Sequence, residues 1–289
     1  MPDAPTIVPC LWFDGQAEAA AEFYVSLFDR STIIRRNSFG GMSGVVTVEF
    51  QLAGGPMVGL NGGPQFRFTP AISLFVMCET VEELDRLWAA LTDGGSAMMP
   101  VDRYPWSERY GCGVDLFGVT WQLMLGPVAD VGQMVTPCLL FVGDVFGRAA
   151  EAITLYTSIF SGSAVDGIQR YGPNQPGREG TVMHAQFALS GAKFMVMDGP
   201  GEHAFGFNEA VSFMVACDTQ ADIDRYWSRL TVGGGAESMC GWLKDPFGVS
   251  WQIVPAWLGE ILGGPNGAAA VRAMLGMRKL DIDALLAAR

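Results

Sequence analysis

The side chains best suited to acid–base chemistry lie on predicted strands in two parts of the chain that have similar sequences. His184, with Gln186 two residues further on and Asp198 on the strand expected beside it, is the strongest general-base candidate, because an imidazole titrates near neutral pH. Glu49, in the matching strand of the first stretch, could act as a base or as the counter-ion of a cationic ligand. A hydrogen-bonded structural histidine and a solvated carboxylate are the alternatives. No Ser-His-Asp or Cys-His arrangement can be assembled, so a nucleophilic triad is not expected.

A second candidate is the segment 103–110, which is rich in aromatic and basic residues and looks like an insertion relative to the second stretch. Its Tyr104, Trp106 and Arg109 could cover a ligand or bind an anion. An ordinary surface loop or a contact between two copies of the chain is the alternative.

Composition narrows the class of protein and its partners. The 289 residues, 49% hydrophobic and 17% charged, suffice for two compact domains. The net charge of −12, without any run of Lys and Arg, argues against nucleic acid as a partner. No basic leader and no stretch of about 18 apolar residues is present, so we expect a cytoplasmic protein that does not bind membranes. The six cysteines contain no Cys-x-x-Cys pair and are interpreted as reduced and structural.

The chain contains two copies of one pattern. The run PCLWFDG (residues 9–15) returns as PCLLFVG (residues 137–143), and DLFGVTWQ (residues 115–122) returns as DPFGVSWQ (residues 245–252). Matching order over more than 100 residues indicates a duplicated domain. We expect domains at 1–127 and 135–257, followed by a helical tail at 258–289 whose apolar positions would pack on the second domain or on a second chain.

The elements that must position the candidate residues follow from the periodicity within each copy. In the first copy a strand at 8–13, a helix at 17–28 and three short strands are followed by a second strand, a helix beginning at the capping box Thr80–Glu83, and more strands. Each copy therefore reads as two βαβββ units. We predict an α+β fold in which the two units of a copy form one curled eight-stranded sheet.

Strand alternation predicts which face each side chain occupies. Val48, Phe50 and Leu52 should lie under helices, which leaves Thr47 and Glu49 on the opposite, concave face. By the same rule Gln122 and Gln252 face the concavity, where small ligands bind. Five tryptophans are predicted to be helix-facing core residues: Trp12, Trp88, Trp121, Trp227 and Trp251.

Together with the paired βαβββ units, the runs at 9–16, 61–68 and 115–122 resemble the 3-demethylubiquinone 3-methyltransferase-like family of the vicinal oxygen chelate superfamily. That superfamily includes glyoxalase I and the bleomycin-resistance proteins. The resemblance covers both copies and extends to residues 273–282 of the tail. It implies a glyoxalase-like fold in tandem, on a scaffold that hosts isomerases, dioxygenases, thiol transferases and drug-binding proteins.

The resemblance also implies where a divalent metal would be held, on one side chain from each of four strands. Carried onto this chain, those positions fall at Pro9, Ala71 and Gln122 in the first copy, and at Pro137, Ala210 and Gln252 in the second. The fourth-strand positions fall within 59–61 and 196–198, where Asp198 alone is a good ligand. With two histidines in the whole chain, we expect no metal-bound site and no cofactor. The methyltransferase label lacks support as well, because no strand, glycine-rich loop and helix unit for S-adenosylmethionine is present.

Three functions remain open. The first is a metal-free small-molecule-binding protein with an apolar or cationic ligand. The second is an enzyme of lyase, isomerase or dioxygenase type, either metal-independent or with an atypical metal site, in which His184 or Glu49 is catalytic. The third is an oligomerisation or regulatory module. A homodimer is one expected assembly. The side chains expected to contact a ligand are Thr47, Asn61, Tyr104, Trp106, Arg109, Gln122, Gln186, Asp198 and Gln252.

Overall fold

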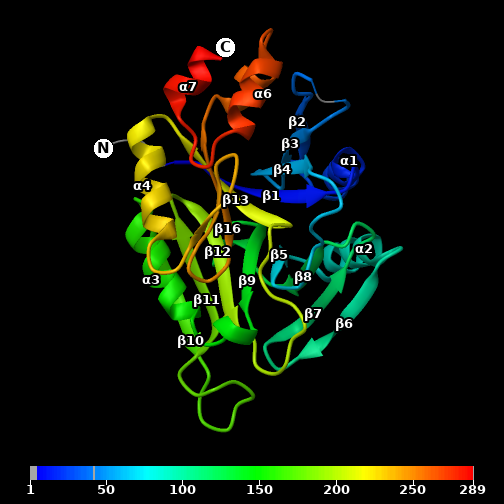
Figure 1. The fold of residues 1–289 in the computed structure, drawn as a ribbon. Coiled ribbons are helices and arrows are strands. Elements are labelled where there is room, and N and C mark those ends of the chain that lie inside the picture. Colours follow the sequence, from blue (N-terminus) through cyan, green and yellow to red (C-terminus); the bar gives the residue numbers. More distant parts are fainter. Residues whose placement is uncertain (1–4, 42, 289) are drawn as a thin grey trace.

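The computed structural model describes residues 5–41 and 43–288, which form two mixed eight-stranded sheets with helices packed against them (Figure 1). Sheet A has the strand order β14-β15-β16-β13-β1-β4-β3-β2, and sheet B has the order β10-β11-β12-β9-β5-β8-β7-β6. The predicted α+β fold of four βαβββ units is confirmed. The strands of sheet A are β1 (Ile7–Phe13), β2 (Thr32–Asn37), β3 (Thr47–Leu52), β4 (Gly55–Asn61), β13 (Val211–Cys217), β14 (Ala236–Glu237), β15 (Trp242–Lys244) and β16 (Ser250–Pro255). Those of sheet B are β5 (Ile72–Cys78), β6 (Ser96–Tyr104), β7 (Ser107–Val114), β8 (Thr120–Leu125), β9 (Val135–Phe141), β10 (Ala164–Arg170), β11 (Val182–Leu189) and β12 (Ala192–Asp198).

Each sheet combines one unit from each sequence copy. In sheet A, β1 of the first copy pairs antiparallel with β13 of the second, so that Cys10 lies opposite Ser212. In sheet B, β5 pairs antiparallel with β9, and Ser73 lies opposite Cys138. The prediction that the two units of one copy share a sheet is therefore wrong.

The physical reason is that the two units of a copy pack back to back instead of edge to edge. Helix α1 (Ala17–Leu27) covers sheet A, yet its Tyr24 donates a hydrogen bond of 2.7 Å to Asp115, which belongs to sheet B's half of the copy. Asp115 also accepts from the Trp121 indole at 2.8 Å and from the backbone N–H groups of Phe117 and Val119, both at 2.9 Å. These bonds explain the repeated DxFGVxW run, because one buried carboxylate organises the turn and joins the two units.

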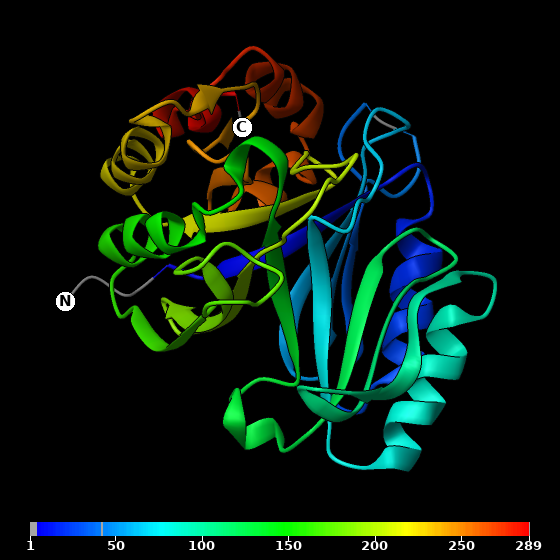
Figure 2. The ribbon, with the colours of Figure 1, turned by 90° about the horizontal axis from the view of Figure 1, so that it is seen from below.

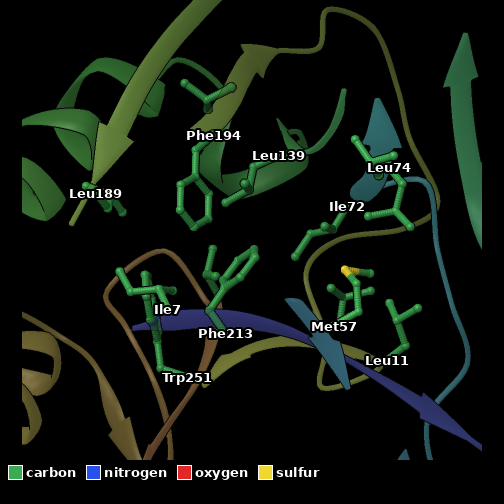
Figure 3. Packing of buried hydrophobic residues seen from close by; sticks show 14 of the residues in the cluster. Ile7, Leu11, Met57, Ile72, Leu74, Leu139, Leu189, Phe194, Phe213 and Trp251 are labelled. Carbon is green, nitrogen blue, oxygen red and sulfur yellow. The ribbon is translucent and has the colours of Figure 1, made fainter. Parts of the chain in front are cut away.

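The second copy repeats this arrangement. Asp245 accepts from Tyr156 at 2.6 Å and from Trp251 at 2.9 Å. Tyr156 comes from α3 (Ala149–Ile159), which packs on sheet B, whereas Trp251 lies on sheet A. Between these two groups the back faces of the sheets meet directly, with Ile7, Phe213 and Trp251 on the side of sheet A across from Phe194, Leu139 and Leu189 on the side of sheet B (Figure 3).

The other two long helices complete the helical layers. They are α2 (Val81–Thr92), against β7 and β8, and α4 (Gln220–Thr231), against β15 and β16. Figure 2 shows α1 beside α2 at one side of the sheets and α3 beside α4 at the other. The N-cap half of the predicted capping box is confirmed, since the Thr80 hydroxyl accepts from the Glu83 N–H at 3.1 Å, while the Glu83 carboxylate accepts from the Glu79 N–H at 2.9 Å. Each sheet has one face that packs against these helices and another that is turned away from them, and the latter is its outer face. No helix in the described part of the chain combines the length and apolar character needed to cross a membrane.

The segment 103–110 is the tip of a long hairpin instead of an irregular loop. Strands β6 and β7 run together up to the pair Tyr104 and Ser107, so only Pro105 and Trp106 make the turn. The matching strands in the second copy, β14 and β15, have two and three residues. The extra residues of the first copy therefore lengthen a sheet edge.

The tail forms three helices over the outer face of sheet A: α5 (Leu258–Leu262), α6 (Gly267–Leu275) and α7 (Ile282–Ala287). Its Leu280 and Leu285 are fully buried with Val254 of β16 and pack with Met214 of β13. It also reaches the first copy, where the Gly40 N–H donates to the Leu262 carbonyl at 3.1 Å. The tail thus packs on strands of the second copy, as expected, and on the β2–β3 connection of the first. Two single 3₁₀ turns, η1 (Val128–Asp130) and η2 (Gly143–Val145), complete the described elements.

Candidate functional site

A cluster of one cysteine, one serine and one glutamine lies on the outer face of sheet A where the two copies meet. Cys10 comes from the first copy, and Ser212 and Gln252 come from the second. The Gln252 amide donates to the Ser212 hydroxyl at 2.9 Å, and all three side chains are buried. Burial raises the pKa of Cys10 to about 11, with hydrogen bonds from Gln252 and Ser212 acting in the opposite direction. The thiol is therefore neutral at physiological pH.

The outer face of sheet B carries the same cluster with the copies exchanged. Cys138 now comes from the second copy, and Ser73 and Gln122 come from the first. The Tyr110 hydroxyl donates to Gln122 at 2.6 Å, and the Gln122 amide donates to Ser73 at 2.7 Å. Burial is also the largest cause that raises the pKa of Cys138, here to about 12. The sequence signal for both clusters was present, because the Pro-Cys run and the Trp-Gln run each occur twice, but the cysteines were interpreted only as core residues.

An open hollow of about 480 Å³ lies on the outer face of sheet A beside this cluster. Its aromatic wall is formed by Trp12, whose ring meets Phe66 at 5.0 Å and Trp242 at 5.6 Å between centroids, both edge to face. The Trp12 indole donates to the Gly63 carbonyl at 2.8 Å, which fixes the ring. A methyl group at Gly62 would come within 2.2 Å of that ring, so this position requires glycine. The prediction that Trp12 faces the helices is wrong: Leu11 and Phe13 do, and Trp12 alternates to the outer face.

The outer face of sheet B has an apolar floor that is rich in sulfur. Phe75, Met77, Tyr110, Cys138 and Met195 are buried there. Further members are only partly buried, and they are Met99, Tyr104, Cys112, Met124, Val128 and Met197. Flexible methionine side chains adapt to ligands of different shapes.

Several predicted site residues gather on this face of sheet B. Gln122 is at the centre, and Tyr104 and Trp106 stack with ring centroids 5.1 Å apart at the hairpin tip. His184 and Gln186 lie on β11, opposite Gln169 and Gly167 of the edge strand β10. The imidazole is half-buried, and burial lowers the pKa of His184.

Three other predicted residues lie on the outer face of sheet A. Gln252 belongs to the central cluster. Glu49 and Thr47 both accept from the Asn37 amide, at 2.7 and 3.1 Å. Asn37, which the sequence reading did not select, therefore orients Glu49. His184 and Glu49 lie on different sheets, so they do not form one site.

The remaining predicted residues point toward the helices. Asn61 accepts from the Ala17 N–H at 2.9 Å, at the start of α1. Asp198, its counterpart, is fully buried and accepts from the Gly147 and Val182 N–H groups, both at 2.8 Å. Arg109 donates from Nε to Asp85 of α2 at 2.7 Å. These side chains cap helices or join a helix to a strand. They do not lie with the predicted site residues on the outer face of either sheet.

The metal positions implied by the resemblance can also be located. Pro9 and Pro137 line a narrow space between the backs of the two sheets, so the outward residues at this point are Cys10 and Cys138. Within residues 5–41 and 43–288, no group of three or more His, Cys, Asp or Glu side chains is placed to hold a metal ion. The six cysteines are free thiols.

Comparison with known proteins gives the family. The model of the family described as 3-demethylubiquinone-9 3-methyltransferase matches residues 5–124 and again residues 133–254. The PhnB protein from Bacillus cereus is 38% identical and covers 41% of this chain and 98% of its own, with a TM-score of 0.39. A protein from Staphylococcus aureus is 33% identical over 43% of this chain and 99% of its own, with a TM-score of 0.19.

Glyoxalase I from Zea mays matches across the tandem: it covers 87% of this chain and 93% of its own at 8% identity, with a TM-score of 0.55. This likeness confirms the predicted glyoxalase-like tandem fold. A search of the curated proteins finds no match. Because the family model matches both copies, the chain belongs to the family described as 3-demethylubiquinone-9 3-methyltransferase and contains two domains of that family in tandem.

Proposed function

We propose that this protein is a metal-free, cytoplasmic small-molecule-binding protein whose ligand occupies the hollow on the outer face of sheet A. The observation that carries the proposal is the hollow itself, about 480 Å³ in volume and walled by Trp12, Phe66 and Trp242. Ligand sites are concave, mainly apolar and furnished with few polar groups. The larger part of this hollow is lined by apolar residues, and its polar lining residues are Glu209, Glu237, Ser238, Lys244 and Ser250.

The aromatic wall is held in place before any ligand arrives. Trp12 is fixed by its bond to Gly63 and by the close approach of Gly62. A rigid wall lowers the entropy that binding must overcome, and flat aromatic surfaces contribute large apolar contact areas.

The chemistry of the central cluster supports binding without a metal. The donors beside the hollow are an amide, a hydroxyl and a thiol that burial keeps protonated. Divalent ions in such folds are held by imidazoles, carboxylates or thiolates. Glu49 is a carboxylate, but Asn37 holds it on β3, at a distance of three strands from Ser212 in the sheet order.

A second candidate function is metal-independent catalysis on sheet B, and it is favoured by His184. Because burial lowers the pKa of this imidazole, it is neutral at pH 7 and able to accept a proton. Gln122, Tyr104, Trp106 and Gln186 would then orient a substrate. An oligomerisation role, with a homodimer as the assembly, remains the third candidate.

A thermal-shift screen of metabolites tests the main proposal. We expect at least one compound to raise the melting temperature of the full chain, and Trp242→Ala to abolish that rise. Trp106→Ala is the matched control, since this exposed tryptophan lies on sheet B and its loss should leave the rise unchanged. A screen without any stabilising compound, or a rise that persists in Trp242→Ala, would overturn the proposed site.

Metal analysis of the purified protein tests the other part of the proposal. We expect no divalent ion at stoichiometric level after dialysis, and one tightly bound ion per chain would contradict metal-free binding. For the second candidate, His184→Gln should abolish any turnover found while leaving ligand binding in the sheet A hollow intact.

A further inference from the structure

The charged side chains that line the sheet A hollow are already paired with one another or with neighbours. The Lys244 ammonium lies 2.9 Å from the Glu209 carboxylate. Glu237 accepts from the Trp227 indole at 2.8 Å and lies 3.9 Å from the Arg278 guanidinium. A ligand therefore gains little by bringing a charge of its own, and a charged ligand would have to displace a partner.

One polar group at the hollow is not paired. The Ser250 hydroxyl is fully buried and finds no hydrogen-bond partner among the residues that the structure describes. Ser250 lines the hollow directly opposite Lys244 on the adjacent strand, on the same face as Gln252. A buried hydroxyl without an acceptor is unfavourable by about 1–3 kcal/mol, so an acceptor atom at this point would be stabilised.

The far wall of the hollow depends on the tail. Residues 238–240 line this wall, and their loop bonds to the tail through two backbone N–H groups: Cys240 to the Met277 carbonyl and Gly241 to the Arg278 carbonyl, both at 2.7 Å. With the tail in place, the hollow is bounded by aromatic rings on one side and by a fixed loop on the other. The faces of these rings offer flat apolar surfaces for contact with an aromatic ligand.

We infer that the ligand of this hollow is a neutral, planar aromatic molecule that carries one hydrogen-bond acceptor. Its ring would lie against Trp12 or Trp242, and its acceptor would take the hydrogen bond of the Ser250 hydroxyl once rotation about χ1 turns that buried oxygen toward the hollow. The inference rests on the proposed function and adds the chemical class of the ligand.

Four indole probes of similar size separate the alternatives by isothermal titration calorimetry on the full chain. Indole is neutral and has no strong acceptor, indole-3-carboxaldehyde is neutral with one, indole-3-acetate is an anion and tryptamine is a cation. We expect the aldehyde to bind tightest, about tenfold more tightly than indole, which is the effect of one hydrogen bond.

Ser250→Ala should reduce the affinity for the aldehyde to that for indole and leave indole itself unchanged. The matched control is Thr120→Ala, the equivalent unpartnered hydroxyl on sheet B, which should change neither. The Ser250→Ala protein should melt no lower than the wild type, because the hydroxyl it loses makes no hydrogen bond to the residues in 5–41 and 43–288.

The outcomes separate the two proposals. Tightest binding of the acetate or the amine, or an aldehyde preference that survives Ser250→Ala, would overturn the inferred class while the hollow remains a binding site. Failure of all four probes, when a screened compound still depends on Trp242, would also overturn the class alone. Binding that is indifferent to Trp242→Ala would overturn the proposed site itself.

Discussion

Asp115 and Asp245 show how one buried side chain can account for a whole sequence motif. Each carboxylate accepts two side-chain and two backbone hydrogen bonds, from the tyrosine of a helix and the tryptophan of a strand among others. The sequence displayed every one of these residues twice. Their connection needed the structure, because Tyr24 and Asp115 are far apart along the chain.

We predict that Asp115→Asn lowers the free energy of unfolding by about 1–3 kcal/mol, because an amide N–H₂ would then face N–H or O–H donors in a buried site. Urea unfolding followed by circular dichroism measures the change. Asp29→Asn, at an exposed position, is the control and should fall within about 0.5 kcal/mol of wild type. Equal stability of the two variants would contradict the organising role of Asp115.

We also predict a pH dependence that His184 causes. Burial lowers the pKa of this side chain below its ordinary value of 6.5, so the unfolded chain binds the proton more readily than the folded one. The contribution of His184 to stability is therefore complete above about pH 6.5 and is lost as the pH falls toward the pKa of the folded state. Urea unfolding at pH 7.5 and 5.5 should show a smaller loss in His184→Gln than in wild type.

His203→Gln is the matched control for that experiment, since it removes the other histidine of the chain. Its loss of stability between the two pH values should be closer to that of wild type. A loss in His184→Gln as large as in wild type would show that the imidazole titrates alike in both states.

For single residues, the face of the sheet on which a strand side chain lies was predictable in regular strands, and the prediction failed where the register was uncertain. Val48, Phe50 and Leu52 lie under helices as predicted, and Thr47 and Glu49 face outward. In β1 the metal position carried over from the resemblance fell on Pro9, whereas the outward residue is Cys10, one position later. A shift of one residue moves a strand side chain to the other face, and alternation alone does not fix the register when both faces are apolar.

Among the elements, the tail has the most direct effect on the candidate site. It covers the end of the outer face of sheet A near Val254 and supports the loop 238–241 that walls the hollow. Helical spacing in the sequence predicted the helices of the tail. The sequence could not show which surface they cover, because that surface is formed only when strands of both copies are side by side.

We predict that Leu280→Ala loosens the tail and the loop together. Removing a fully buried leucine lowers the stability of its surroundings by about 2–5 kcal/mol. Hydrogen exchange should therefore become faster at the Cys240 and Gly241 amides, which bond to the tail. Leu286→Ala is the control, since this leucine of α7 is exposed and its removal should leave both amides protected. Unchanged exchange in Leu280→Ala would mean that the loop holds itself.

The hairpin formed by β6 and β7 illustrates what local sequence can and cannot predict. The run 103–110 was recognisable as extra residues, and its aromatic side chains do lie together at the tip. Arg109, in contrast, alternates to the helix side and pairs with Asp85. The difference arises because strands β6 and β7 continue through the insertion, so that side chains alternate between the two faces.

For the whole molecule, the sequence predicted the duplication, but it did not predict which two βαβββ units share a sheet. The hydrophobic pattern of β1 does not by itself distinguish pairing with β5 from pairing with β13. In the folded chain Tyr24 of α1 packs against Trp121, and Tyr156 of α3 packs against Trp251, so that the two units of each copy contact one another from different sheets.

We predict that residues 1–127 expressed alone form a dimer. In the full chain, β1 and β5 pair with β13 and β9 of the other copy, so the fragment would expose two apolar strand edges. A second fragment can cover both edges and rebuild two eight-stranded sheets. Light scattering during size-exclusion chromatography measures the mass.

Addition of residues 128–289 should convert that dimer into a mixed pair of the two halves, which mass spectrometry under native conditions would detect. A monomeric fragment that unfolds cooperatively would show that strand pairing between the copies is dispensable.

The exchange of strands between copies also constrains how this protein can evolve. Cys10 meets Ser212 and Gln252, while Cys138 meets Ser73 and Gln122, so the cluster on each outer face contains residues from both copies. A substitution selected in one half alters only part of each surface and leaves the complementary part to the other half. The two copies must therefore change together if the buried contacts of either cluster are to be kept.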